Sequence, residues 1–531
     1  MKNAILIIIG ANLLLLILIN VLKPTEVVNL EQEKLKQKYA VKPVASVDHS
    51  KLPALQKKFQ TPQDVTKACN SCHTETHKEI MASAHWNWER AGYIEGHGIE
   101  FLGKKNVVNN YCIGAKTNEQ ACAKCHIGFG MFNNDNYNYS NQNNVDCMVC
   151  HDNSETYMKG ASMTGYPDRT VNLEKVAQSV GLPMKSNCGS CHFYSGGGNN
   201  VKHGDLEEAQ LNTTRDVDVH MAADGINLEC VDCHTAENHQ IKGKLYSVSS
   251  DHFNRAYCED CHTSTPHLNE MLNTHTVRVS CQACHIPLYA KVNATKMDWK
   301  WSEAGKLKDG KAYETEDSMG NHDYMSIKGS FVWKKNIQPD YVWFNGTSDH
   351  YLVGDTINSI PVKINSLNGS HEDLNSKIIP VKINTGDQIY DTKYNYLIVP
   401  KLYAPEKGDS AFWEDFDWNT AAMAGMKRLG LPFSGEYDFV QTVMYWPVNH
   451  MVAPKEQSLS CSECHTRHDG RLAKLTGFYM PGRDRNTLLD TIGKWLIILS
   501  VAGVVIHNSI RIFTAWRQKK IEAKVINYHE T

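Results

Sequence analysis

The chain has 531 residues with 55 basic and 58 acidic side chains, and its mean hydropathy is −0.44. This length is enough for two or three ordinary domains. The formal charge of −3 excludes the strongly basic class of nucleic-acid-binding proteins. The hydrophobic share of 41% leaves no surplus of aliphatic side chains for a core, so another component has to fill the interior.

One pattern, Cys-x-x-Cys-His, accounts for 16 of the 17 cysteines and occurs eight times. Two thiols at this spacing can add to the two vinyl groups of one porphyrin, and the next histidine then reaches the iron as proximal ligand. Neither a disulfide nor a zinc site requires a histidine immediately after every cysteine pair. The pattern therefore predicts eight covalent c-type hemes. In chain order, motifs 1 to 8 are Cys69, Cys72 and His73; Cys122, Cys125 and His126; Cys147, Cys150 and His151; Cys188, Cys191 and His192; Cys230, Cys233 and His234; Cys258, Cys261 and His262; Cys281, Cys284 and His285; and Cys461, Cys464 and His465.

The spacing of the motifs divides the chain into regions. Seven motifs fall within residues 65–285, so their irons are expected to be close neighbours that carry or store electrons. Residues 286–460 form an insertion, and residues 461–486 hold the eighth motif. We expect a multiheme cytochrome c fold: mainly helices and loops packed around hemes, with a small β-containing insertion and terminal transmembrane helices.

The insertion contains most of the recognisable strand signals. Short β-branched or aromatic segments alternate with Asn, Gly and Asp, which is typical of strands joined by turns. These segments are FVWKKN, YVWFNG, YLVGD, IPVKIN and IIPVKIN. The near-repeat IPVKIN at residues 360–365 and 379–384 predicts two strands that pair with each other.

Both ends of the chain carry an apolar stretch. Residues 1–24 have a basic start and no clear cleavage site, which favours an uncleaved anchor over a cleaved secretory signal; residues 25–64 are a linker. Residues 488–515 predict a transmembrane helix rather than a buried amphipathic one, and the basic tail 516–531 is expected in the cytoplasm. The heme domain is then periplasmic and tied to the inner membrane. His507 within the helix suggests a cytochrome b or quinol-oxidising partner.

Low-spin hemes need a second strong ligand, and the chain has 25 histidines from which to supply it. Spacing does not assign a histidine to its iron, and any one of them could be an ordinary surface residue. The preferred distal candidates are His85, His203, His220, His239, His252, His267, His275 and His450. The weaker candidates, in polar loops or in the insertion, are His49, His77, His322, His350 and His371.

Irregular features cluster near motifs 2 and 4. Cys112 is the one cysteine outside the repeat. After motif 4, Gly196–Gly198 would let the backbone approach a cofactor closely, and Lys202 follows. A lysine amine can bind iron when burial keeps it neutral, and such a ligand is exchangeable, as a substrate site requires. The alternatives are a surface lysine and a small buried cysteine.

These motifs together resemble the octaheme tetrathionate reductase family over roughly residues 65–485. The resemblance is carried by the seven-plus-one motif arrangement, Asn-x-x-Cys before motif 2, GGG-x-x-VKHGDL after motif 4, RDVDVHM, CQACHIP and APKEQSLSCSECH. It implies that motif 2 holds the active-site heme, that Lys202 is its distal ligand, and that Asn109 and Cys112 belong to the active site. Asn199 replaces the acidic residue of the family pattern, and the soluble members lack the C-terminal membrane segment.

The resemblance implies a reductase of tetrathionate, and nitrite or hydroxylamine could react at the same lysine-ligated heme. The expected substrate is a small anionic sulfur or nitrogen oxyanion. The Cys-x-x-Cys-Lys motif of pentaheme nitrite reductases does not occur in the sequence, nor does the long-spaced motif of octaheme sulfite reductases. The alternative function is a membrane-anchored conduit that passes electrons from the quinol pool to periplasmic partners.

Overall fold

The computed structural model describes residues 30–111, 113–133, 135–243 and 254–529. The predicted N-terminal anchor 1–24, Cys112 and His252 lie outside the described residues. The chain forms two compact units, Met1–Leu459 and Ser460–Thr531. Motifs 1 to 7 and the insertion belong to the first unit, and motif 8 and the C-terminal apolar segment belong to the second.

The heme motifs lie in short helical turns, because residues three apart share one face of a helix and both thiols must face the same porphyrin edge. Side-chain caps begin several of these turns: Thr61 and Asp64 cap α3, and Glu229 and Asp232 cap α10. The helices of the first unit are α2 (Leu30–Ala40), α3 (Pro62–Asn70), α4 (Thr76–Met81), α5 (Ala84–Asn87), α6 (Glu119–Cys122), α7 (Met148–His151), α8 (Leu173–Gln178), α9 (Lys185–His192), α10 (Cys230–Cys233), α11 (Glu270–His275), α12 (Cys281–His285), α13 (Phe412–Asp415) and α14 (Trp418–Leu429).

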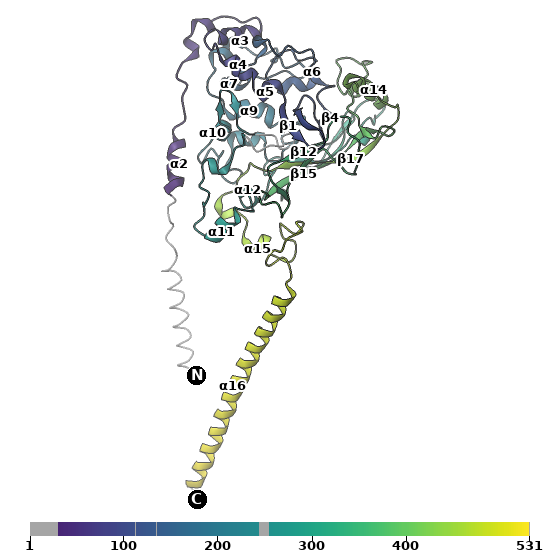
Figure 1. Ribbon diagram of the computed structural model, residues 1–531. Helices are drawn as coiled ribbons and strands as arrows, with labels where there is room; N and C mark the ends of the chain where they lie inside the picture. The colour runs from purple at the N-terminus through teal and green to yellow at the C-terminus, as the bar shows by residue number, and fades with distance from the viewer. Residues whose placement is uncertain (1–29, 112, 134, 244–253, 530–531) are drawn as a thin grey trace. The chain divides into compact units, whose positions relative to one another are not determined.

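The insertion folds into a nine-stranded sheet, and Figure 1 shows it with α14 on the opposite side of the first unit from the motif helices α3, α7 and α9. Its order is β13-β17-β15-β7-β10-β9-β8, with β11 and β16 also pairing with β15. Its strands are β7 (Thr295–Lys300), β8 (Glu314–Glu316), β9 (His322–Met325), β10 (Gly329–Lys334), β11 (Asp340–Phe344), β13 (Val362–Lys363), β15 (Lys377–Asp391), β16 (Tyr396–Leu397) and β17 (Tyr437–Pro447).

Four small two-stranded sheets complete the β-structure of the described residues. Two of these hairpins precede motif 2 in the chain: β1 (Arg90–Ile94) with β2 (Gly98–Leu102), and β3 (Val108–Asn109) with β4 (Ile113–Gly114). The others are β5 (Ala236–Glu237) with β6 (Gln240–Ile241), and β12 (Ser348–His350) with β14 (Asn365–Leu367). Tyr111, between β3 and β4, joins the core of the large sheet, with its ring 5.5 Å from that of Trp299.

Two strand predictions were wrong. The IPVKIN copies do not pair with each other: β13 runs parallel to β17 and β15 runs antiparallel to it, so that Thr442 and Val443 of β17 lie between them. A strand has two hydrogen-bonding edges, and the local sequence specifies strand propensity but not the partner. The YLVGD segment, residues 351–355, forms no strand although all its residues are described; β12 ends just before it.

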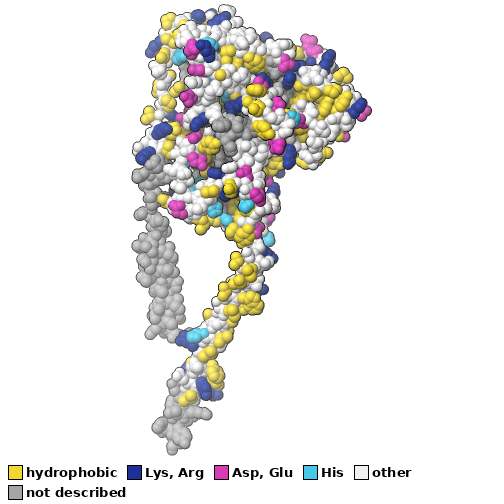
Figure 2. All heavy atoms as spheres, in the orientation of Figure 1, with side chains coloured by type: hydrophobic (Ala, Val, Ile, Leu, Met, Phe, Trp, Pro, Cys, Tyr) yellow, Lys and Arg dark blue, Asp and Glu magenta, His cyan; other side chains and the backbone are white. Residues whose placement is uncertain are grey.

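The second unit contains α15 (Cys461–Cys464) and α16 (Thr487–His529). Within α16, the stretch Thr487–Ile521 is long and apolar enough to cross a membrane, with a mean hydropathy of 1.9 and no part of it buried. Figure 2 shows hydrophobic side chains along this helix, followed by basic ones. The predicted segment 488–515 falls inside α16, which continues beyond it.

The close approach of β7 and β15 yields a first prediction. A Cβ atom on Gly386 would lie 2.4 Å from the carbonyl oxygen of Trp299, so only glycine lets these strands meet. We expect Gly386→Ala to lower the unfolding free energy by about 1–3 kcal/mol. The measurement is thermal unfolding of the holoprotein. Gly225→Ala is the control, because its Cβ would meet only ordinary contacts at 3.4 Å; equal melting of both variants would contradict the prediction.

Candidate functional site

Five motif histidines face a second imidazole ring across a constant gap. The ring centroids are 6.1–6.4 Å apart in each pair, and the partner comes from a different segment of the chain. The pairs are His73 with His49, His192 with His85, His234 with His450, His262 with His220, and His285 with His267.

This gap fits one iron atom with two axial imidazoles. A metal–nitrogen bond of about 2 Å on each side, with the ring centre about 1 Å beyond each nitrogen, separates the centroids by about 6 Å. Ala84, Asn87 and Arg90, which flank His85 in the chain, line an open cavity of 520 Å³, which lies in the size range of ligand sites. The residues of these five motifs therefore fit bis-histidine hemes.

The hydrogen bonds of several motif and candidate histidines leave Nε2 available for a metal. Nδ1 of His151 lies 2.8 Å from the carbonyl oxygen of Gly181, and Nδ1 of His234 lies 2.9 Å from that of Lys242. Such bonds fix the tautomer and the ring plane, as the outer partners of metal-bound histidines do. Burial also lowers the pKa of His192 to about 4, so this ring is neutral and able to bind iron.

The proximal histidine of motif 8 is oriented within the second unit in the same way. Nδ1 of His465 lies 2.7 Å from the carbonyl oxygen of Pro481, and the backbone N–H of His465 donates to the carbonyl oxygen of Cys461 at 2.8 Å. With Nδ1 engaged, Nε2 is the nitrogen left for iron. His465 stays the predicted proximal ligand of motif 8. Because it does not belong to the five ring pairs above, those pairs identify no distal histidine for this motif.

The other candidates are placed differently. His49, one of the weaker distal candidates, faces His73. His203, a preferred candidate, instead packs its ring edge-on against Trp446 at 4.6 Å, and none of the five described ring pairs includes it. His239 is close enough to His151 for its charge to help burial lower the pKa of that residue. His275 ends α11, with Nδ1 2.7 Å from the carbonyl oxygen of Met271.

The second cysteines of motifs 1 and 7 differ in exposure. Cys72 of motif 1 is exposed, and its Sγ lies 3.9 Å from Ser71 Oγ. Cys284 of motif 7 is half-buried, and its carbonyl oxygen accepts from the backbone N–H of Leu459 at 3.0 Å, which holds the end of the insertion against motif 7. None of the 16 motif cysteines is joined in a disulfide. Cys72 and Cys284 therefore stay predicted heme attachment sites.

Thiols of different motifs lie side by side. Because each thiol attaches to one edge of a porphyrin, these contacts indicate which heme motifs are neighbours in space. In four pairs of cysteines, the interaction between the two thiols is the largest influence on their pKa values. It lowers the pKa of one thiol and raises that of the other. These pairs are Cys69/Cys147, Cys125/Cys191, Cys188/Cys230 and Cys281/Cys258, the lowered thiol first.

Two further thiol contacts complete the order. Burial, and then the charge of Cys188, raise the pKa of Cys150 to about 12. Burial, and then the charge of Cys261, raise that of Cys233 to about 11. The motifs therefore follow one another in space as 1, 3, 4, 5, 6 and 7, and motif 2 branches from motif 4.

Motif 2 has surroundings unlike those of the five pairs. The buried ring of His126 lies 5.5 Å from Trp86, 5.4 Å from Trp88 and 5.5 Å from Tyr137, and no imidazole faces it among the described residues. Its Nε2 is 2.7 Å from the carbonyl oxygen of Trp86, so binding of iron through Nε2 requires that this hydrogen bond be given up. Burial lowers the pKa of His126 to about 3.

A buried ion pair joins motif 2 to motif 3. Lys159 Nζ lies 3.1 Å from a carboxylate oxygen of Asp146, and both side chains are almost fully buried. The same ammonium donates to the carbonyl oxygen of His126, and Asp146 immediately precedes the first cysteine of motif 3. Tyr157 donates to the same carboxylate at 2.7 Å. The ion pair thus holds the backbone of motif 2 against motif 3.

Strand β15 supports both segments that the sequence analysis assigned to the active site. Gln388 donates to the carbonyl oxygen of Asn109 at 3.0 Å. Lys382 donates to the carbonyl oxygen of Lys202 at 2.8 Å, to that of Val201 at 2.9 Å and to Thr295 Oγ1 at 2.6 Å. Lys202 is 6% exposed, and its Nζ lies 6.0 Å from the centre of the Trp446 ring.

Lys382 is a further residue of this region that was not among the predicted site residues. Burial holds the pKa of this side chain well below its usual range, and three acceptors satisfy its donors. The sequence does contain one indication of this contact, a lysine within the mainly apolar run IIPVKIN. A lysine inside such a strand is rarely buried unless its amine has hydrogen-bond or ionic partners.

Comparisons with known proteins place these features in context. The crystal structure of octaheme cytochrome c from Shewanella oneidensis superimposes with a TM-score of 0.76 and 42% sequence identity, covering 83% of this chain and 98% of that chain. A family model described as bacterial cytochrome c matches residues 296–468. An uncharacterized protein of Archaeoglobus fulgidus is 26% identical over 247 residues, 37% of this chain and 80% of that protein. The family-model match includes the large sheet as well as motif 8.

The His49–His73 pair yields a second prediction. Removing a distal imidazole leaves a heme with one strong ligand, so we expect His49→Ala to convert one heme in eight to a high-spin state. The measurement is electron paramagnetic resonance of the oxidised holoprotein. His322→Ala is the control, because this histidine lies in β9 beside Glu314. An all-low-spin spectrum of the His49 variant would refute the assignment.

Proposed function

Because the chain belongs to the octaheme cytochrome c family and carries covalent heme c, we propose that it is an exported reductase with eight hemes, which reduces its substrate at the heme of motif 2. The observation that carries this proposal is the difference between the residues around His126 and those around five other motif histidines. Five of them face a second imidazole, whereas aromatic rings surround His126. A heme without a fixed imidazole on its distal side has a position for an exchangeable ligand or substrate.

Lys202 is the proposed distal ligand at motif 2, with Asn109 and Cys112 in the same site. The bound heme supplies electrons and a coordination position. Lys202 contributes its neutral amine; after displacement and protonation it balances the negative charge of the substrate. Lys382 donates to the carbonyl oxygen of Lys202 and so fixes the loop that carries the proposed ligand. These features support an anionic substrate.

The proposed substrate is tetrathionate, on the resemblance described above. Two electrons break its central S–S bond and release two thiosulfate anions, so no proton is consumed. Nitrite and hydroxylamine are further substrates, because a lysine-ligated heme does not by itself select a sulfur compound. Neighbouring cysteines would hold hemes at motifs 1, 3 and 4 close to one another and to motif 2, so that two electrons could reach motif 2 in rapid succession.

The proposed location is the outer face of the inner membrane. The apolar stretch Thr487–Ile521 anchors the chain, and the basic residues that follow Ile510 keep the C-terminus in the cytoplasm. An N-terminal anchor would place that end in the cytoplasm as well. Electrons then come from a quinol-oxidising or cytochrome b partner in the same membrane, and His507 lies in the spanning helix where it would meet such a partner.

The Lys202 assignment is tested by Lys202→Ala. We expect the spectrum of one heme to change while the other seven stay low-spin, and turnover with tetrathionate, nitrite and hydroxylamine to fall at least tenfold, because the ligand and its charge are both lost. Visible and electron paramagnetic resonance spectra with steady-state kinetics measure this. Lys175→Ala, at an exposed position of α8, is the control. An unchanged spectrum with full turnover would reject Lys202 as ligand.

A second candidate function is an electron conduit, and one observation favours it: the order of motifs 1, 3, 4, 5, 6 and 7 is continuous without motif 2. Rapid mixing separates the two functions. A reductase reduced with dithionite is expected to be reoxidised by tetrathionate, nitrite or hydroxylamine within the turnover time. Slow reoxidation by all three compounds, with rapid exchange with a redox dye, would identify a conduit.

A further inference from the structure

The loop that carries Lys202 is held by hydrogen bonds along its length. Residues 200–205 form neither helix nor strand, and five of the six are buried. The backbone N–H and C=O groups of such a segment need partners from other parts of the chain. Most of these partners come from β7, from β15 and from the segments that precede β7 and follow β17 in the chain.

Asn200 fixes the start of the loop. Its backbone N–H donates to the carbonyl oxygen of Phe193 at 2.9 Å, and its Nδ2 donates to that of Asn293 at 3.0 Å. Its own carbonyl oxygen accepts from Thr295 Oγ1 at 2.5 Å. The chain therefore enters the loop in a fixed position, two residues before Lys202.

Lys382 fixes the backbone at Lys202 itself. The Lys382 side chain is fully buried, and its Nζ donates to the carbonyl oxygens of Val201 at 2.9 Å and Lys202 at 2.8 Å. These two oxygens belong to the two peptide planes that meet at the Cα atom of Lys202. One amine thus holds both planes, and its third bond, to Thr295 Oγ1 at 2.6 Å, connects this contact to the start of the loop. The backbone dihedral angles of Lys202 are therefore set from the large sheet.

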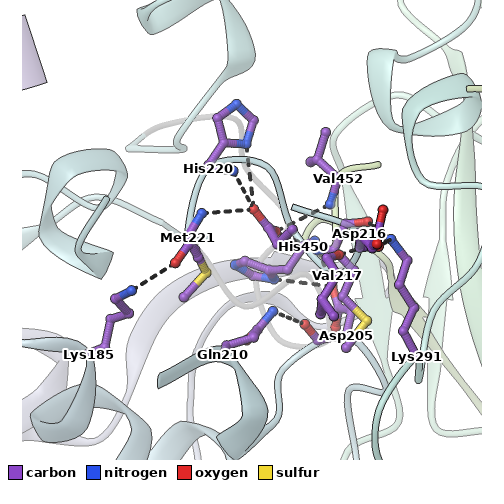
Figure 3. A network of polar contacts seen from close by, with 12 residues as sticks. Lys185, Asp205, Gln210, Asp216, Val217, His220, Met221, Lys291, His450 and Val452 are labelled. Atoms are coloured by element: carbon purple, nitrogen blue, oxygen red, sulfur yellow. Dashed lines mark hydrogen bonds and ion pairs between the residues drawn. The ribbon is translucent and has the colours of Figure 1, made fainter. Parts of the chain in front are cut away.

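Gly204 and Asp205 fix the end of the loop. The carbonyl oxygen of Gly204 accepts from the backbone N–H of Ala290 at 2.7 Å. The Asp205 carboxylate accepts from the backbone N–H of His450 at 3.0 Å, and the Asp205 carbonyl oxygen accepts from Gln210 Nε2 at 2.9 Å (Figure 3). Asp205 is 1% exposed, so water hardly competes for these bonds. The loop is therefore fixed on both sides of Lys202.

These contacts leave the side chain of Lys202 as the part of the residue that can move. Its amine stands on a flexible four-carbon stem, and Nζ lies 6.0 Å from the centre of the Trp446 ring. A ligand tethered beside a metal competes with any external ligand, and its effective concentration rises when the tether is confined to the right place. A fixed backbone therefore makes the amine a strong competitor that returns to the same position after it leaves the iron.

We infer that Lys382 is a positioning residue that sets how easily another ligand displaces Lys202 from the heme of motif 2. It acts through the backbone of the loop, to which two of its three hydrogen bonds are made. The inference rests on the proposed ligand role of Lys202 but not on the identity of the substrate, because every substrate meets the same competing amine.

The test is a titration of the oxidised full-length holoprotein with imidazole, a neutral ligand of ferric heme. Electron paramagnetic resonance follows the heme whose signal changes in Lys202→Ala. We expect that heme to bind imidazole about tenfold more tightly in Lys202→Ala than in the wild type, because the competing amine is gone. In Lys382→Met the amine remains but its backbone is released, so we expect the Lys202-dependent signal to persist without imidazole and the affinity for imidazole to rise about threefold.

Two further variants separate positioning from a general loss of stability. Thr295→Val keeps the shape and removes one of the three acceptors of Lys382, so a smaller rise in affinity is expected; this variant decides the question if Lys382→Met does not fold. Lys185→Met is the matched control, because it also removes a buried lysine. Its Nζ donates to the carbonyl oxygen of Met221 at 2.9 Å, outside the loop of Lys202, so wild-type affinity is expected (Figure 3).

The outcomes distinguish this inference from the proposed function. Wild-type affinity in both Lys382→Met and Thr295→Val, with tight binding in Lys202→Ala, would overturn the positioning role and leave Lys202 as the ligand. An equal rise in Lys185→Met would overturn it as well, because the effect would then be general. Wild-type affinity in Lys202→Ala would refute the proposed ligand itself.

Discussion

The separation of two imidazoles across one iron is the constraint on which the rest of this structure depends. Five histidine pairs hold their centroids 6.1–6.4 Å apart although the partners come from distant segments. Short helical turns place the thiols and proximal ligand on one side of each site, and loops fixed by buried hydrogen bonds bring the distal ligand to the other. Porphyrin faces then fill the space that aliphatic side chains fill in other proteins of this size.

The large sheet is coupled to this arrangement through one strand. Two side chains of β15 that are six residues apart, Gln388 and Lys382, donate hydrogen bonds to the carbonyl oxygens of Asn109 and Lys202. The insertion carries no heme motif, yet it holds both segments that the family resemblance assigns to the active site. The packing of this sheet, including the contact at Gly386, therefore fixes the backbone at Asn109 and Lys202.

Charge adds a second level of organisation to the order of the motifs. Carboxylates accept from Nδ1 of His239 and of His450, and the buried Lys159–Asp146 ion pair joins motif 2 to motif 3. Such buried charges act strongly on neighbouring groups because their fields are poorly screened where water is excluded.

The sequence by itself determined the number of Cys-x-x-Cys-His motifs, their division into seven and one, the strand-rich insertion and the apolar C-terminal helix. Each of these is written in a short local pattern: a thiol spacing, a β-branched run or an apolar stretch. Only the tertiary structure decided that His49 rather than His203 faces a motif histidine, that both IPVKIN copies flank β17, and that Lys382 lies beneath Lys202, 180 residues away in the chain. Spacing carries no information on such contacts, because they depend on where distant segments meet after folding.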